Sequence, residues 1–494
     1  MVDECSIDAS LSLLGGTIFH FIVGIKTMWG NIAPYVTSYL VQFDPHVTYH
    51  KTLHVYTAVF LGQSLTMYLG GELEKLVGPR ITAYIGTIMI SGGTYMSSYC
   101  TTLRGLIYCQ AVAGIGIGLS YSAPILCGFR HFKQNKGIVT GVITTGTGAG
   151  PFMAGLIATS FVNSENYPVD SITGLYDPLA SPVVGRVPSM FRILGILYAV
   201  IGFVGASLLL DNTSNNEEPI EALLVSVENG EKSALNKGSA IGVYDMAMLE
   251  EVPPTFAVDS KSYLVKGRGH QRYGSRVKFE VTFELTTPQM IRDSLCWLVI
   301  AASICIGVTG LYVSATFKSF GQTAIADDHF ITVVGCFGCL CSGLSRTFWG
   351  STADRIGHFE TLELSAYISP AIMLVYTLSV GSKLAFGISV CALFWLWGAS
   401  YCLMPAIVAF LFGDKHLGTN YGFVFLVYGV MCTVIINSAG NTGMEFGQLN
   451  YVFTFIALIG AGLCSHIRYL TSKVKDEKVL KHHRAQSSVS SMIL

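Results

Sequence analysis

The sequence predicts an all-α membrane protein with twelve transmembrane helices arranged in two pseudo-symmetric bundles of six. Three observations support this fold class. Of 494 residues, 51% are hydrophobic and only 12% are charged, whereas a soluble protein carries about 25% charged residues. Apolar stretches of about 20 residues, the length that crosses a bilayer as a helix, recur along the chain. A short motif with glycines and a charge occurs once in each half.

Twelve apolar stretches meet the length requirement for a membrane-crossing helix. They lie at residues 11–40, 54–74, 81–98, 105–129, 137–162, 189–210, 290–316, 329–349, 361–380, 384–411, 419–439 and 449–470. The first stretch is not typical of a secretory signal peptide, because its leader carries Asp3 and Glu4 where a signal would be basic.

The spans divide the chain into five regions. We expect a cytosolic N-terminus, a first six-helix bundle, a cytosolic linker, a second six-helix bundle and a cytosolic tail, at residues 1–10, 11–210, 211–289, 290–470 and 471–494. The linker is polar, starts acidic, ends basic and has no sustained apolar period. It is therefore expected to be largely disordered.

Lysine and arginine are unevenly divided between the two sides of the predicted membrane. Apart from the linker and the tail, one side collects Lys75, Arg80, Arg130, Lys133, Lys136, Arg355 and Lys415. The other side holds Lys51, Arg104, Arg186, Arg192, Lys318 and Lys383. Positive charge favours the cytosolic side, so we expect both termini to be cytosolic. The plasma membrane is the favoured location and an organelle membrane the alternative, because no retention or transit motif is visible.

The repeated motif follows the second span of each half. Each copy has a glycine, a charge at the fifth place and a glycine at the eighth. The glycines let helices approach and the turn bend, and the charges could contact helix ends of the other bundle. The residues expected to control the conformational change are Gly71, Lys75, Gly78 and Arg80, and Gly350, Asp354, Arg355 and Gly357. Two similar bundles that rock about a central site are what an alternating-access carrier requires.

Arg346 lies inside the eighth predicted span. Its guanidinium stays charged at any relevant pH, and placing it at mid-bilayer costs about 2.5–3.5 kcal/mol on insertion scales. A chain can accept this cost when the charge faces an aqueous cavity that holds an anion. We therefore interpret Arg346 as a substrate-binding residue.

Lys26 lies near the middle of the first predicted span. A lysine can snorkel to the interface only from near a helix end, so we expect Lys26 to face the cavity. A pair formed by Lys26 and Arg346 would hold a carboxylate from both bundles at once and so couple occupancy to closure.

Four further side chains within the spans are candidates for lining the pathway: Trp29, Asn31, Tyr121 and Tyr428. Each could equally bridge helices, since buried amides and hydroxyls commonly hydrogen-bond across bundles in membranes, and Trp29 could serve packing only. Gln63 and Gln110 are weaker candidates. His20 is interpreted as a packing residue that faces away from Lys26.

The predicted spans contain no Asp or Glu near their centres. Because cation symport usually needs a carboxylate at mid-depth, the pattern favours uniport or anion exchange. Movement of a proton with a weak acid is an alternative, with the substrate or Lys26 as its carrier.

Other classes of protein are disfavoured. The glycine-rich fifth span, from Gly137 to Gly150, lacks the strand and the acidic partner of a nucleotide-binding loop. Cys336, Cys339 and Cys341 lie on one helix and cannot converge as a tetrahedral metal site. We expect no cofactor, no metal and no nucleic-acid partner, and no enzymatic activity, because no constellation of catalytic residues has convergent spacing.

Several stretches besides the paired motif match a known pattern: Thr27 to Tyr35, Gly78 to Arg80, Phe317 to Gln322 with Asp327 and Asp328, and Pro405 with Phe412 to Gly422. They resemble the major facilitator superfamily and, within it, the oxalate–formate antiporter family and its monocarboxylate-transporter-like relatives. The resemblance covers almost all the membrane part and omits the linker and the tail. It implies the major facilitator fold of two six-helix bundles.

The chain departs from this family in three ways. In the first motif, Lys75 replaces an acidic residue and Leu76 the basic residue that follows. Dicarboxylate exchangers of the family have an arginine in the eighth span, matched by Arg346, and a lysine in the eleventh, where this chain has Tyr428. One cation and a phenol suit a monoanion better than a dianion. Ser342 stands where proton-coupled monocarboxylate carriers have an aspartate.

The residues and the resemblance together predict a transporter of small organic anions that acts by alternating access as a monomer in the lipid bilayer. Monocarboxylates such as pyruvate, lactate or formate are the first choice of substrate. A neutral or cationic solute, with Arg346 as a gate residue only, is the alternative. A third hypothesis is a non-transporting sensor or scaffold of transporter fold.

Overall fold

The computed structural model describes residues 7–132, 136–170, 173–177, 182–210, 263–266, 280–413 and 416–492. Only the backbone is described at residues 136–137, 263–266, 280–283 and 472–492. The chain divides into two compact units. Unit 1 comprises residues 1–210 and 283–494, and unit 2 comprises residues 211–282.

The first half of unit 1 is helical throughout its described length. Its elements are α1 (Ile7–Val23), the 3₁₀ helix η1 (Gly24–Met28), α2 (Trp29–Val41), α3 (Tyr49–Met96), the 3₁₀ helix η2 (Ser97–Tyr99), α4 (Leu103–Ser120), α5 (Ala123–His131), α6 (Lys136–Val162) and α7 (Val183–Ser207). The second half contains α9 (Thr287–Arg292), α10 (Ser294–Gly321), α11 (Asp328–Ile356), α12 (His358–Leu378), α13 (Lys383–Phe412), α14 (Leu417–Gly440) and α15 (Phe446–Met492).

The described helices match the predicted all-α fold. Among the described residues, nine stretches are long and apolar enough to cross a membrane: Ile7–Val41, Leu103–His131, Val183–Ser207, Ser294–Gly321, Asp328–Ile356, His358–Leu378, Lys383–Phe412, Leu417–Gly440 and Phe446–Thr471. The helix α3 bends at Gly78, whose φ of 82° suits a residue without a side chain, so it supplies two further segments. Together with α6, the described chain contains the twelve predicted segments.

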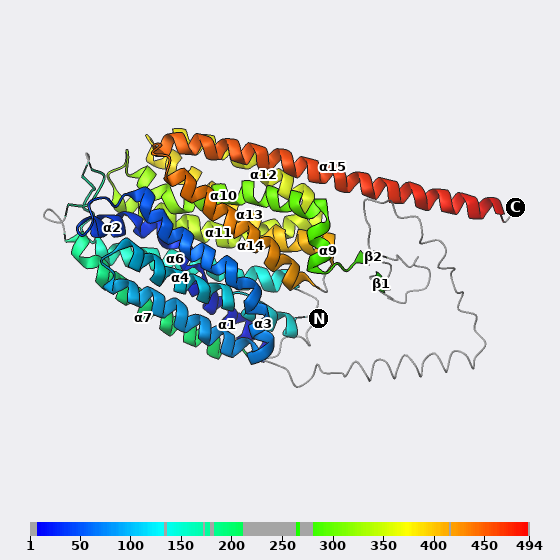
Figure 1. Ribbon diagram of the computed structural model, residues 1–494, viewed down its shortest axis with the longest axis horizontal. Coiled ribbons are helices and arrows are strands. Elements are labelled where there is room, and N and C mark those ends of the chain that lie inside the picture. The colour runs from blue at the N-terminus through cyan, green and yellow to red at the C-terminus, as the bar shows by residue number, and fades with distance from the viewer. Residues whose placement is uncertain are drawn as a thin grey trace. The chain divides into compact units, whose positions relative to one another are not determined.

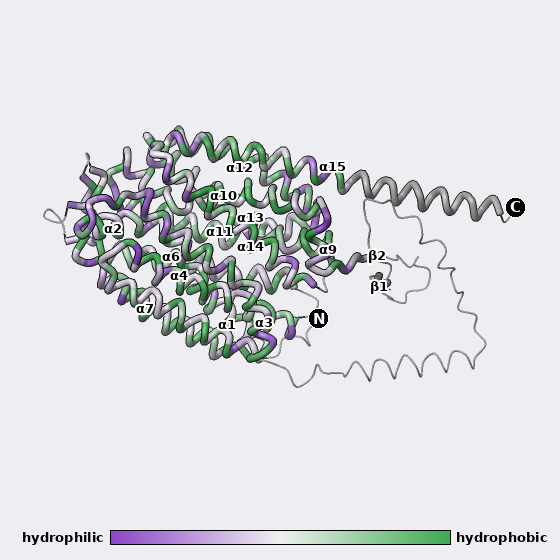
Figure 2. The backbone as a smooth tube through the Cα atoms, viewed as in Figure 1, coloured by the Kyte–Doolittle hydropathy of each residue, from purple (hydrophilic) through white to green (hydrophobic). Residues whose placement is uncertain are grey.

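The two halves pack along their length, with α6 against α11, α3 against α14 and α2 against α10 (Figure 1). Small residues permit this approach, because a Cβ at Gly148 would lie 2.9 Å from Gly343 and a Cβ at Gly30 would lie 2.2 Å from the Ser314 carbonyl oxygen. Hydrophobic residues are spread over all the long helices (Figure 2). Large apolar side chains such as Ile196, Phe410 and Phe455 are exposed, as expected for a lipid-facing surface.

The predicted linker, residues 211–289, contains ordered elements within its described part. Strand β1 (Tyr263–Lys266) pairs with strand β2 (Glu280–Phe283), whereas residues 211–262 and 267–279 lie outside the described residues. The helix α9 begins with a capping box in which Thr286 and Gln289 satisfy each other's backbone groups. Leu285 holds this segment against the second half, since its backbone N–H donates to the Phe412 carbonyl at 2.9 Å.

Several predicted boundaries differ from the structure by a few residues, and two of the differences concern the linker and the tail. The seventh membrane helix begins at Ser294, four residues later than expected, because the Asp293 side chain caps α10 by accepting from the Leu295 N–H. The last helix continues far beyond the predicted end at residue 470. It is α15, which runs to Met492 through the segment expected to be a tail.

The two ends of unit 1 have different characters, and we call them the motif end and the Asp328 end. The motif end holds Gly78 and Gly357, which both have positive φ and mark the repeated motif. The Asp328 end is the opposite one, where α2 ends and where α11 begins at Asp328. The long helices run between these two ends, and α3 does so twice because of its bend at Gly78 (Figure 1).

Candidate functional site

Lys26 lies where the first membrane helix is interrupted by η1. The break accompanies a close approach to α6, because a Cβ at Gly24 would lie 2.2 Å from the Thr147 carbonyl oxygen. The Lys26 ammonium donates to the Gln63 side-chain oxygen at 2.5 Å and lies over the rings of Phe60 at 5.1 Å and Tyr401 at 5.2 Å. The residue is only 9% exposed, so its charge has aromatic and amide neighbours inside the protein.

Arg346 belongs to the second half and lies over the same Tyr401 ring that Lys26 approaches from the first half. Its guanidinium carbon lies 5.2 Å from the centre of that ring, and one guanidinium nitrogen donates to the Thr144 carbonyl at 3.2 Å. The Nε atom is buried and has no hydrogen-bond partner within the part of the chain that the structure describes. Within the described residues, no carboxylate lies within ion-pair distance of Arg346 or Lys26. The structure thus brings together the two cations that the sequence singled out.

A small cavity lies beside Tyr401 within the second half. It is lined by Ser303, Ser400, Tyr401, Met404, Tyr421, Val424, Phe425 and Tyr428. The side-chain hydroxyls of Ser400, Tyr401 and Tyr428 are buried without a hydrogen-bond partner among the described residues. A buried hydroxyl without a partner is costly, so this cavity offers hydrogen bonds to a ligand.

The other predicted pathway residues fall into two groups. Tyr428 lines this cavity, and its ring packs on Phe60, which also contacts Lys26. Tyr121 is half-buried, lies within electrostatic range of Arg346 and packs its ring on His20 at 5.4 Å. Both residues therefore lie beside the paired cations.

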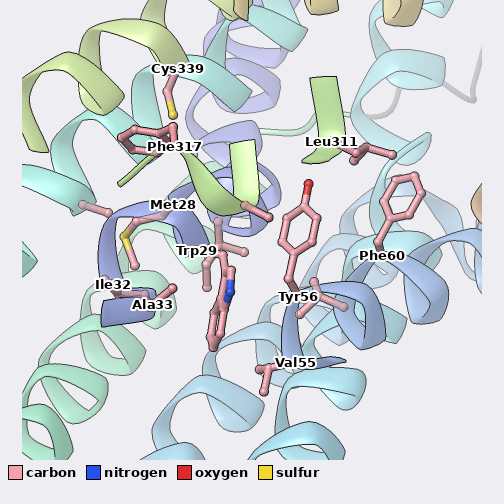
Figure 3. Packing of buried hydrophobic residues seen from close by; sticks show 14 of the residues in the cluster. Met28, Trp29, Ile32, Ala33, Val55, Tyr56, Phe60, Leu311, Phe317 and Cys339 are labelled. Atoms are coloured by element: carbon pink, nitrogen blue, oxygen red, sulfur yellow. The ribbon is translucent and has the colours of Figure 1, made fainter. Parts of the chain in front are cut away.

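Trp29 and Asn31 lie further along the first membrane helix. The Trp29 indole N–H has no partner among the residues described, and the side chain lines a second small cavity with Lys26, Tyr56 and Gln110. Figure 3 shows this indole next to Tyr56, whose hydroxyl points toward the helix that carries Leu311. Asn31 donates to the Cys336 sulfur at 3.6 Å and so connects the two halves. This contact corresponds to the helix-bridging role, the alternative to lining the pathway.

The Asp328 end contains a polar network that the sequence did not predict. We define the Asp328 network as Tyr35, Asn163 and Tyr176 of the first half with Lys318, Gln322, Asp328 and Thr332 of the second. The Lys318 ammonium lies 2.8 Å from the Asp328 carboxylate, and these side chains are 0% and 1% exposed. Lys318 follows the seventh predicted span, which ends at residue 316, and was therefore counted as a charge outside the membrane. The signal available was the family resemblance of the stretch Phe317 to Gln322 with Asp327 and Asp328.

Asp328 joins the two halves through its hydrogen bonds. Its carboxylate accepts from the Tyr176 hydroxyl at 2.8 Å, from the Asn163 amide at 3.0 Å and from the Tyr35 hydroxyl. Burial and the Asp328 charge raise the pKa of Tyr176 well above its ordinary value. The charges and donors of this network have partners, whereas the Gln322 side-chain oxygen is buried without one among the described residues. The network therefore links the two halves at this end with directional contacts.

Asp327, the residue before Asp328, forms a second and more exposed set of contacts beside the network. Asp327 pairs with Lys383 at 2.7 Å and accepts from Asn166 at 3.1 Å. The ion pair with Lys383 lowers the pKa of Asp327 below its ordinary value of 3.8. These contacts again link the two halves at the Asp328 end.

The charges of the repeated motif make local contacts at the motif end. Lys75 pairs with Glu72 on its own helix at 2.8 Å, and Arg80 donates to the Leu209 carbonyl of its own half at 3.0 Å. Asp354 and Arg355 are exposed, and neither has an ion-pair partner in the described part of the chain.

The glycines of the motif serve the backbone in different ways. Gly78 and Gly357 adopt φ values of 82° and 106°, which other residues rarely adopt. Gly71 faces open space, and a Cβ at Gly350 would lie 3.2 Å from the Cys402 sulfur. The turns are therefore formed, but the expected contacts with helix ends of the other bundle are not seen among the described residues.

Two helical halves that enclose a pair of buried cations and are linked at one end by a polar network have the architecture of a membrane transporter. The chain belongs to the Major Facilitator Superfamily, whose family model matches residues 18–436. It is a multi-pass integral membrane transporter of small molecules rather than an enzyme.

Three named transporters are similar to this chain. Apicoplast pyruvate carrier 1 of Toxoplasma gondii is 25% identical over 468 residues, which cover 84% of this chain and 80% of that protein. The oxalate:formate antiporter of Oxalobacter formigenes is 21% identical, with 72% and 66% covered. Monocarboxylate transporter 14 of Mus musculus is 23% identical, with 75% and 73% covered. These similarities agree with the family resemblance of the sequence motifs.

The fold is also that of solved transporters. The xylose transporter XylE of E. coli, in a partially occluded inward-open conformation, superimposes with a TM-score of 0.62 at 10% identity and covers 92% of this chain and 97% of its own. At this identity the likeness concerns the fold alone.

Proposed function

We propose that this transporter carries small organic anions, and monocarboxylates of the pyruvate, lactate or formate type in the first place. The observation that carries the proposal is the approach of Lys26 and Arg346, one from each half, to a single Tyr401 ring without a carboxylate partner in the described chain. Two buried charges of the same sign repel each other. An anion between them would remove this repulsion.

The two cations differ in how they would hold a carboxylate. The Arg346 guanidinium is a planar fork that can donate two parallel hydrogen bonds, whereas the Lys26 ammonium is a point charge. Because they come from opposite halves, one bound carboxylate would stabilise the state in which both halves close around it. The bundles would then rock with the site neutralised, which suits uniport or anion exchange.

The cavity beside Tyr401 supports a monoanion over a dianion. Its walls are largely aromatic, and its polar groups are the unpartnered hydroxyls of Ser400, Tyr401 and Tyr428. A second carboxylate would meet no third cation there among the described residues, whereas a keto or hydroxyl oxygen would meet hydrogen-bond donors. The names of the similar pyruvate carrier and monocarboxylate transporter point to the same class of substrate.

The two ends of the molecule would alternate in closing the site. The Asp328 network would be the closed gate of the present state, and the repeated motif, from Gly71 to Arg80 and from Gly350 to Gly357, would control closure of the motif end. The positive charge on the motif side indicates that this end and both termini face the cytosol. We further propose that the protein acts as a monomer, in the plasma membrane or in an organelle membrane.

Uptake into proteoliposomes tests the proposal. Purified wild-type protein is expected to take up labelled pyruvate, lactate or formate, with competition by monocarboxylates and none by organic cations or neutral solutes. Arg346→Gln is expected to abolish uptake at unchanged reconstitution. Arg192→Gln is the matched control, because Arg192 also lies over a tyrosine ring, that of Tyr99 at 6.0 Å, but away from the site. Full uptake by Arg346→Gln, or competition by cations only, would contradict the proposal.

A further inference from the structure

Two cysteines lie in contact at the Asp328 end, outside the substrate site. Cys100 follows η2 in the turn between α3 and α4, and Cys109 lies within α4. Their sulfur atoms are 3.6 Å apart. From this geometry we propose that Cys100 and Cys109 form a disulfide that fastens the start of α4 to the end of α3.

The surroundings place both sulfurs on the same side of a tight turn. Thr102 caps α4, because its side-chain oxygen accepts from the Gly105 N–H at 3.2 Å. This cap holds the first turn of α4 close to Cys100. A Cβ at Gly105 would lie 3.4 Å from the Cys100 sulfur. A disulfide brings its sulfurs to about 2.05 Å, so bond formation needs a movement on the order of 1.5 Å in a partly exposed turn.

The bond would form by exchange with a small disulfide such as oxidised glutathione. One cysteine thiolate attacks that disulfide, forms a mixed disulfide and releases one glutathione thiol. The second cysteine thiolate then attacks the mixed disulfide at the protein sulfur, closes the Cys100–Cys109 bond and releases the second thiol. The two cysteines are oxidised, and one molecule of oxidised glutathione is reduced to two thiols.

The position of the bond would give it a structural role near the transport pathway. Gln110, directly after Cys109, donates to the Ser97 hydroxyl at 2.9 Å and lines the cavity that also contains Lys26 and Trp29. Fastening Cys109 to Cys100 would therefore fix Gln110 relative to the end of α3. This role is independent of the nature of the substrate.

Tryptic peptide mapping tests the proposal, because Arg104 lies between the two cysteines. Purified full-length protein is incubated with oxidised glutathione, its remaining thiols are alkylated under denaturing conditions, and it is digested without reductant. Cleavage after Arg104 separates the peptides 81–104 and 105–130, so only a disulfide keeps them joined. We expect the joined pair in the wild type and in the control Cys305→Ser, and its loss in Cys100→Ser and Cys109→Ser.

Two results would overturn the proposal. One is complete alkylation of both cysteines after oxidation, and the other is a product in which each carries only glutathione. Thermal unfolding provides a second measurement that does not depend on the serine variants. Oxidised wild type is expected to unfold at a higher temperature than the same sample after reduction, and an equal temperature would contradict a fastening role.

Discussion

Lys318 and Asp328 form an ion pair of 2.8 Å in which both side chains are almost completely buried. The pair belongs to the second half, but its remaining hydrogen-bond positions are filled mainly by the first half, through Tyr35, Asn163 and Tyr176. Opening of the Asp328 end must therefore separate Asp328 from three donors at once. This arrangement makes the pair the central contact of the gate that we propose at this end.

The first prediction concerns removal of the buried carboxylate. Asp328→Asn leaves the Lys318 ammonium buried without its counter-charge, which typically destabilises a protein by about 3–5 kcal/mol. We expect a clearly lower thermal unfolding temperature in detergent and loss of uptake. Asp327→Asn is the matched control, because its ion pair with Lys383 is partly exposed and such pairs contribute about 1 kcal/mol or less. Equal effects of the two variants would contradict the assigned role of Asp328.

The second prediction separates charge from shape at Arg346. Arg346→Lys keeps a positive charge but loses the planar fork and its position over the Tyr401 ring. We expect weaker monocarboxylate uptake, with a KM raised about tenfold to a hundredfold, since hydrogen bonds to charged groups contribute about 1.5–3 kcal/mol. Concentration-dependent uptake into proteoliposomes measures the effect. A KM equal to that of the wild type would show that only the charge matters.

The third prediction concerns the hydroxyl of Tyr428, which has no partner in the described chain. Tyr428→Phe is expected to raise the KM for pyruvate by about threefold to tenfold, which corresponds to the loss of a typical hydrogen bond. The KM for propionate is expected to stay unchanged, because propionate has no keto oxygen. Tyr376→Phe is the matched control, since its buried hydroxyl also has no partner among the described residues and its ring packs on Phe320 and Phe386 rather than beside the cations. An equal loss for both acids would argue against a contact with the keto oxygen.

The fourth prediction follows from the lowered pKa of Asp327, which is caused chiefly by Lys383. A carboxyl with a lower pKa in the folded state stabilises that state fully above its ordinary value of 3.8. The contribution disappears as the pH falls below 3.8 through the lower folded value. Because the pair is partly exposed, its contribution to the free energy of unfolding is expected to be below about 1 kcal/mol. Thermal unfolding of the wild type and of Asp327→Asn across this range measures it, and the difference between them should vanish at the acidic end.

The fold could be predicted from the sequence because the membrane restricts the choices. Apolar runs of sufficient length must form helices in lipid, so composition and run length were enough to locate the described helices, including both segments of α3 on either side of Gly78. The motif repeat gave the division into two halves. The ordered α9 and the long α15 were not foreseen, because their polar sequences lack the run length on which the prediction depended.

The site was predictable only where a charge had no other explanation. Lys26 and Arg346 stood out because a charge at mid-depth is costly, and the structure places both at Tyr401. Tyr401 itself could not be recognised among many tyrosines. The Lys318–Asp328 pair was missed because ion pairing across a turn depends on tertiary contacts, and because both residues lie near span ends where charges are ordinary.

The most direct test is a double-mutant cycle on pyruvate binding to purified protein. The dissociation constant is measured by titration calorimetry for the wild type, Lys26→Gln, Arg346→Gln and the double variant. If one carboxylate contacts both cations, the two losses should be non-additive by more than about 0.5 kcal/mol. Strictly additive losses, or pyruvate binding that neither substitution weakens, would contradict a shared anion site.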